Sequence, residues 1–263
     1  MPCSTASASP RHWSCSTLSE TATTPTPVAQ RRLRGAIFDY GGVMTESVFR
    51  RRRDADPDVV SLLVFFINDL RSIYHLPTSS AHDLHMLETG QLSEAEFFRR
   101  LCARHEEAGG PHIDPECVRE AVFAQRAEAS AAMVDTVRQL RSAGYRTALL
   151  TNNAREWEPM WRSMIPVDEL FDVVVDSSVV GLRKPDPAIY RLTCERLGLP
   201  PQDCIFVDDL QCNVDAAAGL GMEVVHCTDP GDAADVVARR LLGRPASAEP
   251  EDGGGAEVAE ERR

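Results

Sequence analysis

The strongest constraint on the fold is an alternation of five short apolar segments with helical patterns. Between most of these segments, apolar residues recur at helical spacing, as they do over 133–140 before Gly144. Strands that alternate with helices indicate a parallel sheet covered on both faces. The sequence therefore predicts an α/β fold with a Rossmann-like, doubly wound parallel sheet. The predicted strands lie at 33–40, 145–151, 171–176, 204–208 and 222–226.

The first and second predicted strands are separated by a long helical stretch, which sets the domain organisation. Residues 45–130 carry helical patterns, including a capping box formed by Ser93 and Glu96. A stretch of this length is far too long for an ordinary crossover between neighbouring strands. We therefore expect a helical cap subdomain at 45–130, inserted into an α/β core that comprises 33–44 and 131–243.

The two ends of the chain differ in composition from the rest. Residues 1–32 are rich in Ser, Thr, Pro and Ala, with Glu20 as their acidic residue, and we expect a disordered leader. A transit peptide is the alternative for this segment. Residues 244–263 are polar, glycine-rich and acidic, which predicts a disordered tail.

Charge and cysteine usage limit the partners and the compartment. The net charge is −12, which argues against a nucleic-acid-binding protein. The eight cysteines form no CxxC pair and no zinc-spaced cluster with histidine, which is typical of reduced thiols in a cytoplasmic protein. No apolar run approaches the roughly 18 residues of a membrane span. We expect a cytoplasmic protein that binds neither nucleic acid nor membranes.

Polar side chains follow the apolar segments at four places along the chain. Ligands in open α/β sheets bind outside the carboxyl ends of the strands, so these side chains are expected in one crevice. Each one alone is more typical of a helix cap, a turn or a solvated loop, and their ordered occurrence together is what points to a site. The side chains are Asp39, Thr151 with Asn152 and Asn153, Lys184, and Asp208 with Asp209, followed by Asn213.

Four stretches of the chain resemble, in order, the motifs of the haloacid dehalogenase superfamily. The resemblance covers roughly 34–228. The combination of motifs is similar to that of the phosphatase-like subgroup related to the amino-terminal domain of soluble epoxide hydrolase. The stretch LETGQLSEAEFFRRL also resembles part of the helical cap of that superfamily. The four motif stretches are FDYGG, LLTNN, GLRKPDPAIY and IFVDDLQCNVDAAAGLGM.

The resemblance implies a role for each residue that bonds the substrate. Asp39 would be the nucleophile, giving an aspartyl phosphate. Thr151 and the backbone near Asn152 would bond the phosphoryl oxygens, and the backbone at Gly41 and Gly42 would border the same group. Lys184 would offset the charge of the nucleophile and of the phosphoryl group.

The resemblance also implies a Mg²⁺ site. Asp39, Asp208 and Asp209 would hold the cation, together with the backbone carbonyl of Gly41. Adjacent carboxylates repel each other unless a cation or a proton compensates them, and a hard divalent ion is the usual solution. Asn213 would support the acidic loop from behind.

Gly41 departs from the superfamily pattern and leaves three functions open. Phosphatases of this superfamily place there an aspartate that protonates the leaving group, and glycine cannot do so. The chain is then a phosphatase of a small phosphorylated metabolite that lacks this acid, a metal-independent 2-haloacid dehalogenase, or a catalytically silent binding module. Because a carbon-attacking dehalogenase gains nothing from paired acids, Asp208 and Asp209 favour the phosphatase.

Substrate identity depends on the cap, where the resemblance is weakest, and two further details stay open. Glu46, His82 and His85 are the local candidates for a replacement proton donor. Trp157 and Trp161 lie four apart on an expected helix, which favours core packing or a subunit contact. The oligomeric state is therefore open, with a homodimer as one alternative, and the natural substrate is not specified.

Overall fold

In the computed structural model, the residues whose structure is described all fall within one of the two units of the chain, Arg31–Arg263. The predicted leader at 1–32 and the predicted tail at 244–263 lie outside this description. The structure describes residues 33–46, 57–73, 82–124 and 128–243.

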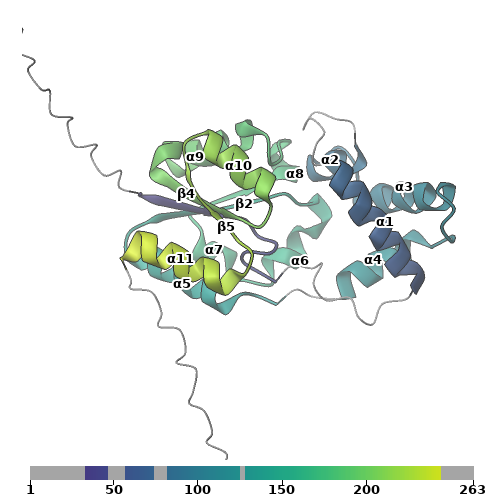
Figure 1. Ribbon diagram of the computed structural model, residues 1–263, viewed down its shortest axis with the longest axis horizontal. Coiled ribbons are helices and arrows are strands. Elements are labelled where there is room, and N and C mark those ends of the chain that lie inside the picture. Colours follow the sequence, from purple (N-terminus) through teal and green to yellow (C-terminus); the bar gives the residue numbers. More distant parts are fainter. Residues whose placement is uncertain (1–32, 47–56, 74–81, 125–127, 244–263) are drawn as a thin grey trace, which may run out of the picture. The chain divides into compact units, whose positions relative to one another are not determined.

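A five-stranded sheet forms the centre of the structure, with the strand order β3-β2-β1-β4-β5 (Figure 1). All four strand pairings are parallel, which confirms the predicted parallel sheet. Because the strands are parallel, their carboxyl ends meet at one edge, with β1 in the middle. The strands are β1 (Gly35–Phe38), β2 (Arg146–Thr151), β3 (Val173–Asp176), β4 (Cys204–Asp208) and β5 (Glu223–His226).

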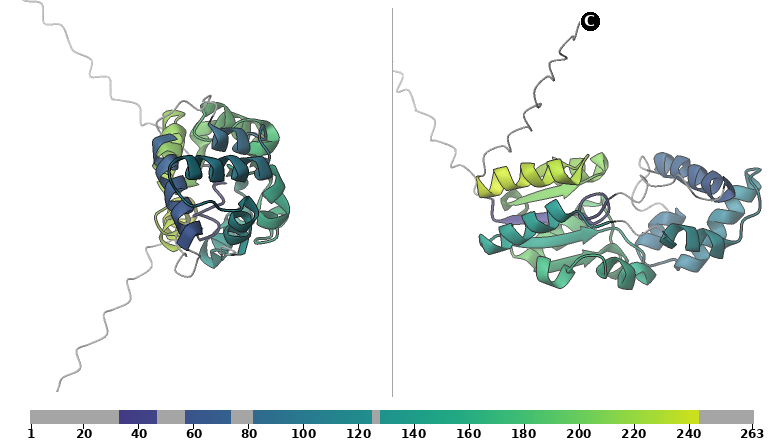
Figure 2. Two further views of the ribbon diagram at one scale, coloured as in Figure 1. Left: turned by 90° about the vertical axis from the view of Figure 1, so that its right-hand side faces the viewer. Right: turned by 90° about the horizontal axis from the view of Figure 1, so that it is seen from below.

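Helices cover both faces of the sheet, as the alternating pattern predicts. On one face lie α5 (Ala131–Ser142) and α11 (Pro230–Leu242), and on the other α9 (Pro187–Leu197) and α10 (Gln211–Gly219) (Figures 1 and 2). Side chains of each strand alternate between the two resulting apolar clusters. The doubly wound α/β fold class is thus confirmed.

Short helical elements connect the larger ones around the sheet. Most of them are too short to show a periodic pattern in the sequence, and a helix was expected only around Trp157 and Trp161, where η1 and α6 lie. They are η1 (Arg155–Trp157), α6 (Glu158–Arg162), α7 (Val167–Leu170), α8 (Ser177–Val180) and η2 (Pro201–Asp203).

Four helices follow β1 in the chain, and we refer to α1–α4 as the helical insert. They are α1 (Pro57–Ile73), α2 (Asp83–Glu88), α3 (Glu94–Glu107) and α4 (Pro115–Ala124). The insert has an apolar cluster of its own, built around Leu62, Leu87, Phe97, Leu101 and Val118. Ala154, from the loop after β2, is buried in the same cluster, so the insert packs against that loop.

The predicted capping box at the start of α3 is only half formed. The Ser93 hydroxyl accepts a bond of 3.3 Å from the Glu96 backbone N–H, as predicted. The Glu96 carboxylate instead accepts bonds from Arg99 and Arg100. Charged guanidinium donors one turn along the helix form stronger bonds than the backbone N–H that a capping box would use.

None of the described helices is both long enough and apolar enough to cross a membrane.

Gly90 marks a close approach between the insert and the α/β part of the structure. Its φ of +70° favours glycine, and a Cβ built there would overlap the Ser178 carbonyl in α8. Gly109 has a similar φ of +90°, but a Cβ there would have no atom within 4 Å. A comparison of alanine substitutions at the two glycines therefore separates the cost of backbone strain from the cost of steric overlap.

We expect Gly90→Ala to lower the free energy of unfolding more than Gly109→Ala does. Gly109→Ala should cost about 1–2 kcal/mol, because a residue with a Cβ is strained at positive φ. Gly90→Ala should add the cost of displacing the insert from α8. Urea unfolding followed by circular dichroism measures both, and equal losses would show that the Gly90 contact contributes nothing.

Candidate active site

The site lies where β1 and its two neighbours end. Asp39 follows β1, Thr151 is the last residue of β2 and Asp208 is the last residue of β4. The register pairs Phe38 with Val207 of β4, and the Asp39 backbone N–H donates to the Val207 carbonyl at 2.9 Å. Asp39 and Asp208 are thereby held at the same level on adjacent strands.

Lys184 joins these two carboxylates. Its Nζ lies 2.6 Å from Asp39 Oδ1 and 2.6 Å from Asp208 Oδ2, and the lysine is 1% exposed. Burial acts to lower the pKa of Lys184, but Asp208 and Asp39 outweigh it and raise that pKa, so the ammonium remains charged. A single buried cation thus bonds two of the acidic groups that the sequence placed at this edge.

Negative charge nevertheless exceeds positive charge in the cluster. Asp39, Asp208 and Asp209 each place a carboxylate oxygen within 4.8 Å of those of the other two. Burial raises the pKa of Asp39 to about 8, with Asp208 and Asp209 adding to the rise and Lys184 opposing it. Burial, reinforced by Asp208, also raises the pKa of Asp209 to about 6. Both shifts mean that another cation would favour the ionised carboxylates.

The three carboxylates therefore fit a hard divalent cation, and they fit it unequally. Asp208 already accepts bonds from Lys184, from the Leu210 backbone N–H and from Asn213. The Asn213 amide donates to both Asp208 oxygens, at 3.0 and 3.1 Å. Asp209 and Asp39 have fewer such bonds, so their oxygens are the more available ligands.

The two glycines after Asp39 and Tyr40 differ in what surrounds them. Gly42 has a φ of +76°, and a Cβ there would overlap the Asp209 carboxylate. Gly41 is exposed, and a Cβ there would meet no atom within 4 Å. Gly42 is thus required by the close approach of Asp209, whereas the position of Gly41 has room for a side chain.

Thr151 and Asn152 occupy different positions in the site. Thr151 is 2% exposed at the end of β2, at the same sheet edge as Asp39. The Asn152 amide bonds the loop that carries Lys184, accepting from the Lys184 N–H at 2.8 Å and donating to the Lys184 carbonyl at 3.0 Å. Asn152 therefore holds the lysine loop, a contact that its predicted substrate-binding role did not include.

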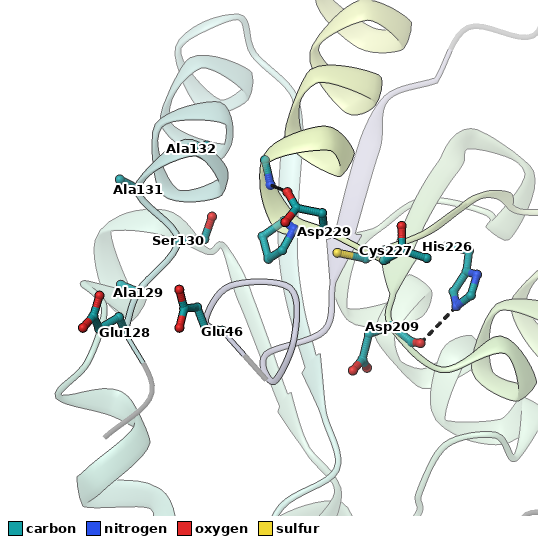
Figure 3. Close-up of a pocket in the computed structure, with 13 residues that line it drawn as sticks. Glu46, Glu128, Ala129, Ser130, Ala131, Ala132, Asp209, His226, Cys227 and Asp229 are labelled. Carbon is teal, nitrogen blue, oxygen red and sulfur yellow. Dashed lines mark hydrogen bonds between the residues drawn. The ribbon is translucent and has the colours of Figure 1, made fainter. Parts of the chain in front are cut away.

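A cavity of about 660 Å³ adjoins Asp209 (Figure 3). Glu46, Glu128, Asp229 and His226 also line it, and the His226 ring N–H donates to the Asp209 carbonyl at 3.0 Å. Glu46, a predicted proton-donor candidate, therefore shares a cavity with a carboxylate of the cluster.

The two histidine candidates lie in the insert. His82 caps α2, with its Nδ1 accepting from the Leu84 N–H at 3.2 Å. His85 is 3% exposed within α2. A proton-donor role for either residue stays a prediction.

Two contacts beside Lys184 were not predicted. Lys184 bonds Asp208 as well as Asp39, and Arg183 donates from Nε to Glu88 of the insert at 2.6 Å. The stretch that resembles the superfamily cap contains Glu88, which was the only signal in the sequence for the second contact. Strand-end patterns identify the edge at which side chains meet and do not identify which of them pair.

The chain belongs to the haloacid dehalogenase-like hydrolases, a family that residues 33–221 match. This confirms the resemblance inferred from the four sequence motifs.

Three curated proteins are similar to parts of the chain. Acyl-CoA dehydrogenase family member 10 of Mus musculus is 40% identical over 114 residues, 43% of this chain. Bifunctional epoxide hydrolase 2 of Sus scrofa is 25% identical over 207 residues, 75% of this chain, which confirms the predicted relationship to epoxide hydrolase. Phosphatase MT3486 of Mycobacterium tuberculosis is 33% identical over 106 residues, 39% of this chain. The matched stretches span 10%, 37% and 48% of these relatives' own lengths.

A solved structure shows the same fold. The family enzyme BT-2542 of Bacteroides thetaiotaomicron, in complex with magnesium and inorganic phosphate, is similar with a TM-score of 0.53 and 19% identity. The match covers 75% of this chain and 96% of that one.

We expect Gly42→Ala to weaken divalent-cation binding and Gly41→Ala to preserve it. The added methyl group displaces the Asp209 carboxylate in the first variant and meets open space in the second. The measurement is the rise in melting temperature that Mg²⁺ gives over EDTA. The backbone strain of Gly42→Ala lowers the melting temperature equally with Mg²⁺ and with EDTA, so it cancels in this difference. An unchanged rise in Gly42→Ala would exclude Asp209 from the cation site.

Proposed function

We propose that the protein is a Mg²⁺-dependent phosphatase that acts on a small phosphorylated metabolite through an aspartyl-phosphate intermediate. The observation that carries this proposal is the cluster in which Lys184 bonds Asp39 and Asp208 while an Asp209 carboxylate oxygen lies within 4.8 Å of theirs. The similarity to a mycobacterial phosphatase supports it. So does the solved relative of the same fold, which holds magnesium and phosphate.

The chain's own residues divide the chemistry between them. The Asp39 carboxylate attacks phosphorus, the bond to the leaving oxygen breaks, and a water molecule later hydrolyses the acyl phosphate. Lys184 stabilises the ionised nucleophile and the charge on the phosphoryl oxygens, and the Thr151 hydroxyl donates to one of those oxygens. A Mg²⁺ ion held by Asp39, Asp208, Asp209 and the Gly41 carbonyl would neutralise further charge on the transferring group.

Glycine at position 41 leaves the departing oxygen without a proton donor at this position. Positioned acid catalysis is worth about 10²–10⁴-fold, so its loss falls on leaving groups that depart poorly as anions. The aryloxide of an aryl phosphate and the carboxylate of an acyl phosphate depart readily without a proton, whereas the alkoxide of an alkyl phosphate does not. The proposed enzyme therefore favours substrates whose leaving group has a low pKa.

The dehalogenase alternative is less well supported by the site. A carbon-attacking enzyme of this fold would use Asp39 and would gain nothing from Asp209, whose carboxylate only adds repulsion beside an anionic substrate. The silent-module alternative keeps the cation site and lacks turnover. The family description includes haloacid dehalogenases, so family membership alone does not separate these functions.

One assay series separates the three functions. The phosphatase hydrolyses p-nitrophenyl phosphate with Mg²⁺ and stops with EDTA, whereas the dehalogenase releases chloride from 2-chloropropionate regardless of EDTA. The silent module does neither but melts at a higher temperature with Mg²⁺. Chloride release that EDTA does not affect would overturn the proposal.

Gly41→Asp should raise the rate with alkyl phosphates selectively. The position has room for the side chain, and the new carboxyl group can protonate the leaving oxygen. We expect about a 10²-fold gain in kcat/KM for glycerol phosphate and little change for p-nitrophenyl phosphate.

Asp39→Asn is the control for this comparison and should abolish turnover of both substrates. Equal parent rates with the alkyl and aryl substrates would mean that another residue already supplies the proton.

A further inference from the structure

A buried ion pair links the helical insert to the lysine loop. The Arg183 Nε donates to Glu88 Oε2 at 2.6 Å, and the two side chains are 9% and 16% exposed. Glu88 is the last residue of α2, and Arg183 directly precedes Lys184. Burial acts to raise the pKa of Glu88, and Arg183 opposes this rise. The pair therefore joins an element of the insert to the residue next to the ammonium of the site.

Asn152 connects to the same carboxylate. Its Nδ2 lies 3.5 Å from Glu88 Oε2 and donates to the Lys184 carbonyl at 3.0 Å. Its Oδ1 accepts from the Lys184 N–H at 2.8 Å. Asn152 thus bonds both the N–H and the carbonyl of Lys184. Asn152 and Arg183 both contact Glu88.

The position of the Lys184 backbone decides where its ammonium lies. The Nζ atom contacts Asp39 and Asp208 at 2.6 Å each, so a small shift of the loop would lengthen one contact or both. Misplacement of a catalytic group by about 1 Å can cost about 10²-fold in rate. A contact that fixes this loop therefore bears on the reactivity of Asp39 as well as on stability.

We propose that Glu88 is a positioning residue through which the insert holds Lys184 against Asp39. The nucleophile is then fully paired with its cation only while α2 is docked on the lysine loop. This inference rests on the proposed phosphatase function and adds to it a dependence of the chemical step on the insert.

The test combines Glu88→Gln, Arg183→Gln and the double variant, each assayed with p-nitrophenyl phosphate and Mg²⁺. Glu88→Gln should lower kcat about 10- to 100-fold and raise KM only several-fold, because it loosens Lys184, which acts mainly on the nucleophile and also contacts the phosphoryl oxygens. Since Glu88 and Arg183 act through the same bond, the double variant should be no slower than the slower single variant.

The double variant also guards against misfolding. Removing one partner of a buried ion pair leaves an unpaired buried charge, whereas removing both does not. If a single variant fails to fold, the double variant alone tests the proposal, with the same loss in kcat expected. A folded double variant with the parent kcat would overturn the inference.

Glu94→Gln is the matched control. Glu94 is a buried insert carboxylate, 7% exposed, that pairs with Arg119 at 3.0 Å within the insert itself. It should lower the melting temperature and leave kcat unchanged. If Glu94→Gln lowers kcat as much as Glu88→Gln does, the effect reflects the stability of the insert and not the position of Lys184.

Binding of inorganic phosphate separates failure of this inference from failure of the proposed function. Calorimetry with Mg²⁺ should show phosphate affinity falling several-fold in Glu88→Gln and unchanged in Glu94→Gln, whether or not the parent turns over. An inactive parent that shows this pattern would refute the phosphatase and keep the positioning role. Phosphate affinity that is unaffected by Glu88→Gln, or no phosphate binding by the parent, would overturn the positioning role.

Discussion

The bond from the Lys184 ammonium to Asp39 and Asp208 is the interaction on which the rest of the site depends. A lone buried ammonium or carboxylate would be costly, and here each offsets the other. The compensation is incomplete, because three carboxylates share the space with one lysine. Burial raises the pKa of Asp39, and the neighbouring acids Asp208 and Asp209 add to that rise. This excess of negative charge is the physical basis for proposing a further cation at this position.

The fold brings these groups together by simple means. Parallel strands end at a common edge, and the central strand β1 places Asp39 between the ends of β2 and β4. Asn152 then holds the lysine loop, which arrives from beyond β3, while Gly42 allows Asp209 to approach the β1 loop. The helical insert joins this arrangement through Glu88, which bonds Arg183 of the lysine loop, and through Gly90, which approaches α8. The helical insert is thereby linked to the proposed catalytic group Lys184 through the backbone of the lysine loop.

Much of this could be predicted from the sequence, and the rest is long-range pairing. Periodicity identified the sheet and the large helices over it, because those patterns reflect burial along local elements. The positions of Asp39, Thr151 and Asp208 after their apolar segments indicated the edge of the sheet at which the structure places all three. The bond from Arg183 to Glu88 joins residues 95 positions apart, and no local pattern encodes it. The capping box at Ser93 was half wrong, because Arg99 and Arg100 compete for the carboxylate of Glu96.

The proposed attack of Asp39 on phosphorus is tested most simply by finding which residue carries the phosphoryl group during turnover. A reaction with p-nitrophenyl phosphate and Mg²⁺ is quenched in acid within a single turnover, and the peptides are analysed by mass spectrometry. We expect a phosphoryl group on Asp39, and we expect it to be absent when EDTA is present from the start. Turnover with the phosphoryl group on another residue would exclude Asp39 as the nucleophile. A phosphoryl group that still forms on Asp39 with EDTA would exclude the dependence on Mg²⁺.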